Sequence, residues 1–202
     1  HIAHYEEQLS EISVVKFVPA SGAASRMFKS LFTFMDGYKG TDAEYEDFTN
    51  DTSFNAVFNF FKRLDEFAFF DDLKATFEGG EQLEELQLKK EYVSILKHLL
   101  TEKGLDYGSL PKGLLKFHNY EEGNRTPLEE HLVEGARYAN GKQNIVKLHF
   151  TVSPDHEEKF KEKLAQVREK YESNYEVTYE VSFSQQKPST DTIAVDMENK
   201  PF

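Results

Sequence analysis

The sequence contains no cysteine and no tryptophan. Without cysteine the chain can form no disulfide, no thiolate metal site and no cysteine nucleophile. It also lacks any apolar run that approaches the roughly 18 residues of a membrane helix, and no charged and then apolar leader opens it. We therefore expect a soluble, cytoplasmic protein with no membrane partner.

Positive charge is also scarce. The 24 lysine and arginine residues stand against 36 aspartate and glutamate residues, which gives a formal net charge of −12. Such a chain does not attract nucleic acid non-specifically, so we expect no nucleic-acid partner. A local cluster of cations must then hold any phosphate ligand. Hydrophobic residues make up 39% of the 202 residues and aromatic residues 14%, enough for one large domain with a real core.

The two ends of the sequence indicate a piece of a longer chain. His1 stands where an initiator methionine is expected, and residues 200–202 end the chain without a closing helix.

Short apolar strands alternate with amphipathic helices in the first and last parts of the chain. The first strand, residues 14–18, is mostly apolar, which is typical of a strand covered on both faces. The capping box Thr126-Pro127-Leu128-Glu129 predicts the start of a later helix. The expected helices are 2–12, 27–35, 126–140 and one after Ser153, and the later strands are 145–152, 175–183 and 192–197. Their short connections predict a Rossmann-like α/β fold, in which helices flank a mostly parallel sheet.

The middle of the chain has a different character. Residues 40–108 predict a large helical insertion within a single domain that spans residues 1–202. Apolar residues from Leu88 to Leu100 form one amphipathic stripe that ends near Gly104. The phenylalanine-rich stripe at residues 54–70 predicts core packing, with a dimerisation surface as the alternative.

The most informative segment joins the first strand to the next helix, Val18-Pro-Ala-Ser-Gly-Ala-Ala-Ser-Arg-Met-Phe-Lys29. Small side chains let backbone N–H groups approach a ligand, and a helix start adds positive potential. A second cationic element follows far downstream, Leu110-Pro-Lys-Gly-Leu-Leu115. Together they predict a site for a nucleotide or a sugar phosphate. The alternative is a tight strand–helix turn without a ligand, with Lys112 as a solvated surface residue.

In this order, the motifs resemble the nucleotidyltransferase superfamily of the GT-A fold, the sugar-1-phosphate pyrophosphorylases. Residues Ser21–Met27 take the place of its Gly-Gly-x-Gly-Thr-Arg pattern, and Pro111-Lys112-Gly113 that of its Pro-Lys motif. Thr151–Ser153 and Phe183–Gln186 are similar to elements of the UDP-N-acetylhexosamine and UDP-sugar pyrophosphorylases. With Ser189–Thr192, the set looks most like an uncharacterised bacterial family of unknown function that is placed near these transferases.

The resemblance implies transfer of a nucleotidyl group, most simply uridylyl, from a nucleoside triphosphate to a sugar 1-phosphate, with Mg²⁺ as cofactor and release of pyrophosphate. By the same resemblance, Arg26 faces the triphosphate, favoured as UTP, and Lys112 the α-phosphate or the sugar phosphate. The implied nucleotide contacts are Ala20, Ser21, Gly22, Ala23, Ala24, Ser25, Gln185, Gln186 and Asp191. The metal-binding aspartate is expected beyond Phe202.

The chain departs from the transferase pattern at two positions of the loop. Ser21 and Ala24 replace glycines, and Ala24 adds a methyl group where the backbone normally meets the triphosphate. These departures leave a second hypothesis open. The chain is then a non-catalytic nucleotide- or sugar-nucleotide-binding protein that uses the helical insertion as an interaction surface.

Overall fold

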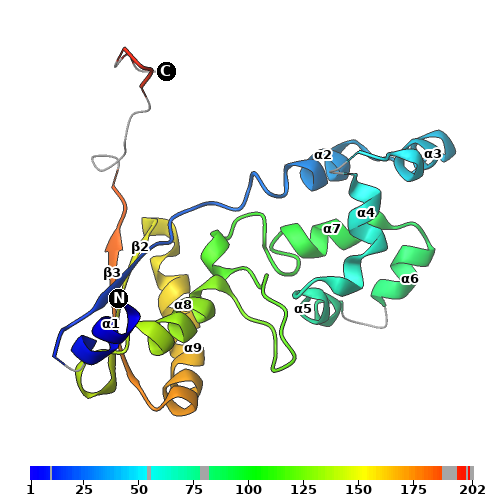
Figure 1. The fold of residues 1–202 in the computed structure, drawn as a ribbon. Helices are drawn as coiled ribbons and strands as arrows, with labels where there is room; N and C mark the ends of the chain where they lie inside the picture. The colour runs from blue at the N-terminus through cyan, green and yellow to red at the C-terminus, as the bar shows by residue number, and fades with distance from the viewer. Residues whose placement is uncertain (10, 54–55, 78–81, 188–194, 199, 201–202) are drawn as a thin grey trace. The chain divides into compact units, whose positions relative to one another are not determined.

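The computed structural model describes residues 1–202 except 10, 54–55, 78–81, 188–194, 199 and 201–202 (Figure 1). The chain forms two compact units, His1–Gly22 with Glu129–Phe202, and Ala23–Leu128. The predicted insertion, residues 40–108, lies within the second unit, which also contains Arg26 and Lys112. Of the helices that the structure describes, none is long and apolar enough to cross a membrane.

A parallel three-stranded sheet forms the centre of the first unit. Its strands are β1 (Val15–Pro19), β2 (Ile145–Val152) and β3 (Thr178–Gln185), and β2 lies in the middle (Figure 1). The register aligns Val18 with Phe150 and Phe150 with Phe183. Because the strands run the same way, their carboxyl ends meet at one edge of the sheet. The predicted α/β class with a parallel sheet is confirmed.

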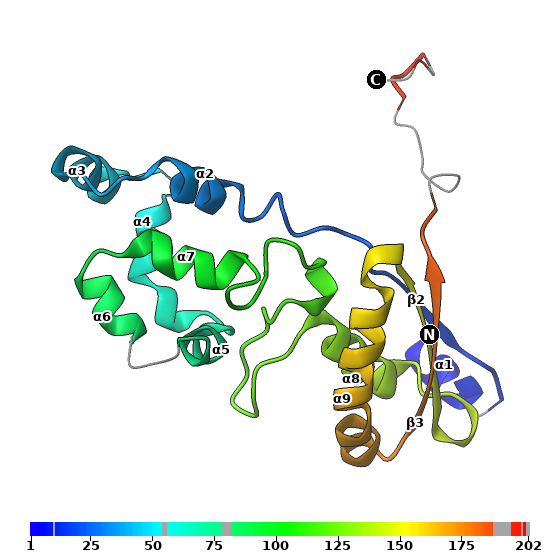
Figure 2. The same cartoon turned by 180° about the vertical axis from the view of Figure 1, so that it is seen from behind.

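Helices pack on one face of this sheet. They are α8 (Pro127–Tyr138), which belongs to this unit from Glu129 onward, and α9 (Glu157–Tyr175), and they lie on the same side of the strands in both ribbon views (Figures 1 and 2). A β-carbon built on Gly135 of α8 would lie 2.8 Å from Val146 Cγ1, so only glycine permits this close approach. The buried layer consists of Val146, Leu148, Phe150 and Val152 of β2 with Phe160, Leu164, Val167 and Tyr171 of α9.

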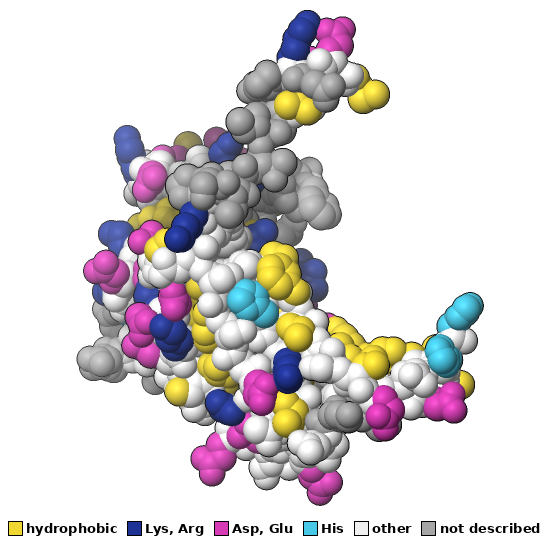
Figure 3. Space-filling model, turned by 90° about the vertical axis from the view of Figure 1, so that its left-hand side faces the viewer, with side chains coloured by type: hydrophobic (Ala, Val, Ile, Leu, Met, Phe, Trp, Pro, Cys, Tyr) yellow, Lys and Arg dark blue, Asp and Glu magenta, His cyan; other side chains and the backbone are white. Residues whose placement is uncertain are grey.

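The opposite face of the sheet is open among the described residues. Val15 and Phe17 of β1 are 55% and 61% exposed, so the prediction that this strand is covered on both faces is wrong. Phe17 stacks on His149, with 5.2 Å between the ring centroids, and His149 contacts the hydroxyls of Ser182 and Ser184 at 2.8 and 2.9 Å. Hydrophobic side chains and a histidine lie exposed together on the first unit (Figure 3). An apolar run is ambiguous here because alternate residues of a strand face opposite sides of the sheet, and the run does not show which side is covered.

The second unit is helical. Thr41 starts its second helix with a complete capping box in which Glu44 is the partner. Its core contains the fully buried Leu64, Leu73, Leu83, Ile95, Leu96 and Leu99. The helices are α2 (Lys29–Gly37), α3 (Asp42–Asn50), α4 (Val57–Lys62), α5 (Phe70–Ala75), α6 (Leu83–Leu88) and α7 (Tyr92–Leu100), with 3-10 turns η1 (Leu64–Glu66) and η2 (Lys112–Leu114).

The stripe from Leu88 to Leu100 is divided between two helices. Lys90, between α6 and α7, has a φ of 60°, in the left-handed region, which ends one helix before the next begins. α7 ends at Leu100, four residues before the predicted end near Gly104. A β-carbon there would lie 2.1 Å from the carbonyl oxygen of His98, at the point where Leu105 N donates to that carbonyl.

The predicted elements at residues 2–12, 145–152 and 175–183 agree with the structure to within a few residues. Strand 145–152 has the predicted bounds, whereas strand 175–183 is observed at 178–185 because α9 continues to Tyr175. Helix 2–12 is observed as α1 (Ile2–Leu9), which donates a hydrogen bond from Tyr5 OH to Tyr138 O at 2.6 Å. Of the predicted strand 192–197, residues 192–194 lie outside the described residues, and residues 195–197 form no strand.

Candidate functional site

The carboxyl edge of the sheet brings together two predicted contacts that lie far apart in the sequence. The strand pairing continues past β1 and β3, because Ala20 N donates to Thr151 O at 2.7 Å and Gln186 N to Val152 O at 2.8 Å. The hydroxyl of Ser21 then donates a hydrogen bond to Gln186 Oε1. In open parallel sheets, ligands bind at the carboxyl ends of the strands. Ser21, Gly22, Gln185 and Gln186 all lie in this part of the first unit.

A second group of polar side chains lies at the same edge. Gln185 Nε2 donates to Glu157 Oε2 at 2.7 Å, at the start of α9, and Lys161 Nζ lies 2.8 Å from Glu157 Oε1. The hydrogen bond from Lys161 and then the one from Gln185 lower the pKa of Glu157 below its ordinary value. Gln185 is therefore positioned by a carboxylate that stays ionised.

The rest of the first motif belongs to the second unit, which begins at Ala23. Ala23 forms an antiparallel bridge with Pro111, the residue before Lys112. The next residue, Ala24, has no exposed surface and belongs to the hydrophobic core with Phe28. Its methyl group therefore contributes to core packing, which accounts for alanine where the transferase pattern has glycine.

Arg26 and Lys112 are both exposed in the second unit. Arg26 lies in a turn that closes from Met27 N to Ala24 O at 2.8 Å and leads into α2. Lys112 starts η2, between the buried Pro111 and the buried Leu115. Among the described residues neither cation has an ion-pair partner, so both are available to an anionic ligand.

A family model described as "Domain of unknown function (DUF4301)" matches residues 1–202. The chain belongs to the DUF4301 family. The match confirms the expected resemblance to a family of unknown function, and it covers both units. Neither the curated proteins nor the solved structures contain a match to the chain. The transferase assignment for this DUF4301 chain therefore depends on the arrangement of its own residues.

Two predicted features of the DUF4301 site concern residues or groups that the structure does not describe. Asp191 lies outside the described residues. Within the described ranges, no three histidine, aspartate or glutamate side chains gather as metal ligands. Mg²⁺ is usually held by only one or two carboxylates together with substrate phosphates, so the expected cofactor stays a prediction.

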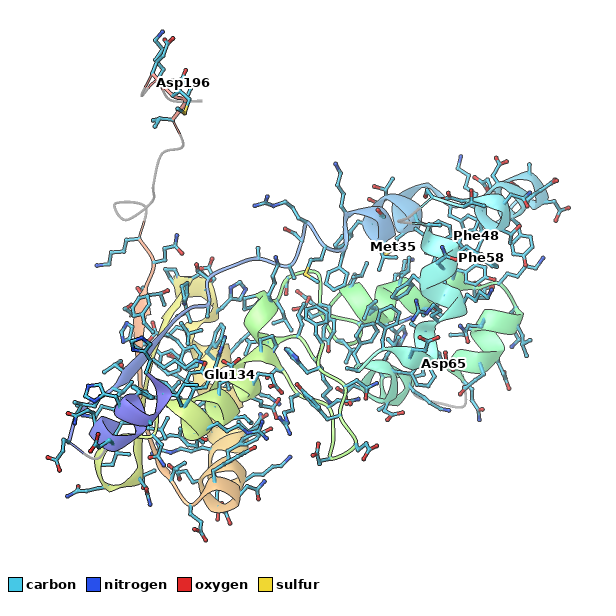
Figure 4. The ribbon with its side chains drawn as sticks, viewed as in Figure 1. Met35, Phe48, Phe58, Asp65, Glu134 and Asp196 are labelled. Atoms are coloured by element: carbon cyan, nitrogen blue, oxygen red, sulfur yellow. The ribbon has the colours of Figure 1, made fainter. Side chains whose placement is uncertain are left out.

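Sequence reasoning missed a hydrogen-bonded cluster around Glu134 of α8, a residue labelled in Figure 4. Lys16 Nζ of β1 donates to the Glu134 carboxylate and to Tyr138 OH, and His131 Nδ1 lies 2.9 Å from Glu134 Oε2. Partial burial raises the pKa of Glu134, but hydrogen bonds from Lys16 and His131 outweigh it and lower the pKa to about 2. The sequence alone shows that residues 131, 134 and 138 share one face of a helix. It does not show that they pair with Lys16.

Proposed function

We propose that this DUF4301 chain is a GT-A-type nucleotidyltransferase of the cytoplasm. It transfers a nucleotidyl group, most simply uridylyl, from a nucleoside triphosphate to a sugar 1-phosphate and releases pyrophosphate. The observation that carries this proposal is the bridge between Ala23 and Pro111, which holds the Arg26 turn beside the Lys112 motif. In a chain of net charge −12, exposed cations on two segments joined by this bridge favour a small polyanionic ligand.

The reaction needs little covalent work from the protein. An oxygen of the sugar phosphate bonds to the α-phosphorus of the triphosphate, and the bond from that phosphorus to the bridging oxygen breaks as pyrophosphate leaves. Both reactants are anions and repel each other, so catalysis consists of alignment and charge neutralisation. We assign Arg26 to the triphosphate and Lys112 to the α-phosphate or the sugar phosphate.

The nucleoside is assigned to the amide side chains of Gln185 and Gln186. An amide side chain both donates and accepts hydrogen bonds, which suits the edge of a base. Gln186 and Gln185 carry such amides at the carboxyl ends of the strands, and Glu157 orients Gln185. The backbone of residues 21–25 is assigned to the phosphates, with the N–H groups as donors.

The second hypothesis is a non-catalytic nucleotide- or sugar-nucleotide-binding protein, and the replaced glycines of the loop favour it. Ser21, which stands in place of a glycine, donates to the amide oxygen of Gln186. That hydrogen bond occupies part of the group that we assign to the base. Binding and turnover must therefore be measured separately.

The test is an assay of pyrophosphate release with each nucleoside triphosphate, a panel of sugar 1-phosphates and Mg²⁺. We expect turnover with one pair of substrates, and a loss of roughly 10²–10³ in rate for Arg26→Ala and for Lys112→Ala, as for other preorganised donors. Lys103→Ala, an exposed lysine of the same unit, is the matched control.

The possible failures of this test have different meanings. No turnover with any pair and no change of melting temperature in UTP would refute nucleotide chemistry altogether. Stabilisation by UTP without turnover would support the binding hypothesis. Stabilisation that persists in both alanine variants would refute the roles of Arg26 and Lys112 alone.

A further inference from the structure

A pocket with a volume of about 530 Å³ lies within the second unit. Its size falls in the range of about 300–1,000 Å³ that is typical of small-molecule sites. Five of its lining residues are phenylalanine: Phe28 of the turn before α2, Phe60 of α4, Phe67 and Phe69 after η1, and Phe117. Leu31, Ala56, Val57 and Met27 add further apolar surface.

Aromatic rings continue from the buried wall of the pocket to its exposed rim. Phe69 is 2% exposed and stacks on Phe67, whose ring centroid lies 5.1 Å away and which is 37% exposed. Phe60, which is half-buried, also lies 5.1 Å from Phe67. Phe67 therefore has one neighbour in the core and one at the pocket surface.

The charged residues that line the pocket neutralise each other. Arg63 Nε and Nη2 donate to Glu66 Oε2 at 3.0 and 2.6 Å. The other polar lining residues are Ser30 and Asn59, both exposed and uncharged. A charged ligand would therefore find no lining side chain of opposite charge that is free to pair with it. The pocket thus differs in chemistry from the surface that carries Arg26 and Lys112.

We propose that this pocket binds an uncharged compound with a planar aromatic ring system. Aromatic walls favour such a ligand because rings pack in offset-stacked or edge-to-face arrangements that add to the gain from apolar burial. The polar rim can orient the ligand through Ser30 and Asn59. The site is independent of the proposed transferase activity, although Met27 and Phe28 directly follow Arg26 in the chain.

The experiment measures binding of 2-naphthol to the full chain by calorimetry and by changes in NMR chemical shift. Decalin, which is aliphatic with a similar ring size, and 2-naphthoate, which is anionic, serve as comparison probes. We expect saturable binding of 2-naphthol and at least tenfold weaker binding of the other two. Ser30→Phe, which fills the pocket from an exposed position of α2, should weaken 2-naphthol binding at least tenfold.

Thr33→Phe is the matched control, because Thr33 is exposed on the same helix but does not line this pocket. Asn59→Phe fills the pocket from α4 and gives an independent test if Ser30→Phe does not fold. The proposal is overturned if 2-naphthol does not bind saturably or binds equally to the folded filled variant and the control. Equal binding of decalin or 2-naphthoate would reject the ligand class, and competition by UTP would reject a separate site.

Discussion

The ammonium group of Lys16 donates a hydrogen bond to the carboxylate of Glu134, 118 positions further along the chain. The contact ties β1 to α8, and it buries a lysine side chain that is only 11% exposed. Glu134 itself is 42% exposed, so solvent screens part of the attraction. The ion pair positions the first strand, which leads directly into the Ser21 loop.

The lowered pKa of Glu134 predicts a specific dependence of stability on pH. A pKa that falls from 4.5 to about 2 on folding stabilises the folded state fully above the unfolded value. This stabilisation is lost as the pH decreases from about 4.5 through about 2. Urea unfolding at a series of pH values should therefore show a smaller loss of free energy for Glu134→Gln than for the wild type over this window. Glu162→Gln, at an exposed position of α9, should follow the wild type. Parallel curves for Glu134→Gln and the wild type would contradict the prediction.

Two phenylalanines of the same sheet should differ strongly in their contribution to stability. Phe150 of β2 has no exposed surface and lies 5.8 Å from Phe183, whereas Phe17 of β1 is 61% exposed. Phe150→Ala leaves a cavity and should lower the free energy of unfolding by about 3–5 kcal/mol. Phe17→Ala should lower it by less than about 1 kcal/mol, because the open face loses mainly the stacking on His149. Equal losses in chemical denaturation would mean that the open face is covered in solution.

Gly135 should be an exception to the usual benefit of alanine in a helix. Replacing a glycine by alanine in the interior of a helix normally stabilises the helix by about 1 kcal/mol. At Gly135 the added carbon would lie 2.8 Å from Val146 Cγ1 and 3.3 Å from Leu148 Cδ2, and overpacking of this kind costs about 1–3 kcal/mol. We expect a net decrease in melting temperature for Gly135→Ala. Gly37→Ala has no atom within 4 Å and should be neutral or slightly stabilising. An increase at Gly135 would show that α8 and β2 separate easily.

The sequence predicts local elements better than it predicts what covers them. The bounds of β2 were predictable because buried residues alternate with partly exposed ones from Ile145 to Val152, and this alternation stops at both ends. The exposure of Phe17 was not, since an apolar residue on an edge strand reads the same whether or not a helix covers it. The break at Lys90 was also hidden, because both helices continue one apolar stripe.

The candidate site shows the same limit. The order of the motifs predicted phosphate contacts from two distant segments, and the bridge from Ala23 to Pro111 joins those two segments. No local pattern predicts that Ser21 and Gln186 share a hydrogen bond, because that contact requires the register of all three strands. The burial of Ala24 was equally hidden, since a small residue suits both a ligand loop and a core.

The contact between Ser21 and Gln186 gives a prediction about base recognition that rests on the proposed function. If the Gln186 amide reads the base, Gln186→Ala removes a neutral hydrogen bond worth about 0.5–1.5 kcal/mol, so affinity for UTP should fall roughly 2- to 13-fold. Affinity for inorganic triphosphate should not change, because Arg26 and Lys112 are intact. Gln166→Ala, an exposed amide on α9, is the control and should bind UTP as the wild type does. Calorimetry decides between the outcomes. An equal loss for UTP and triphosphate would show that Gln186 supports the loop and not the base, whereas unchanged UTP affinity would remove Gln186 from the site.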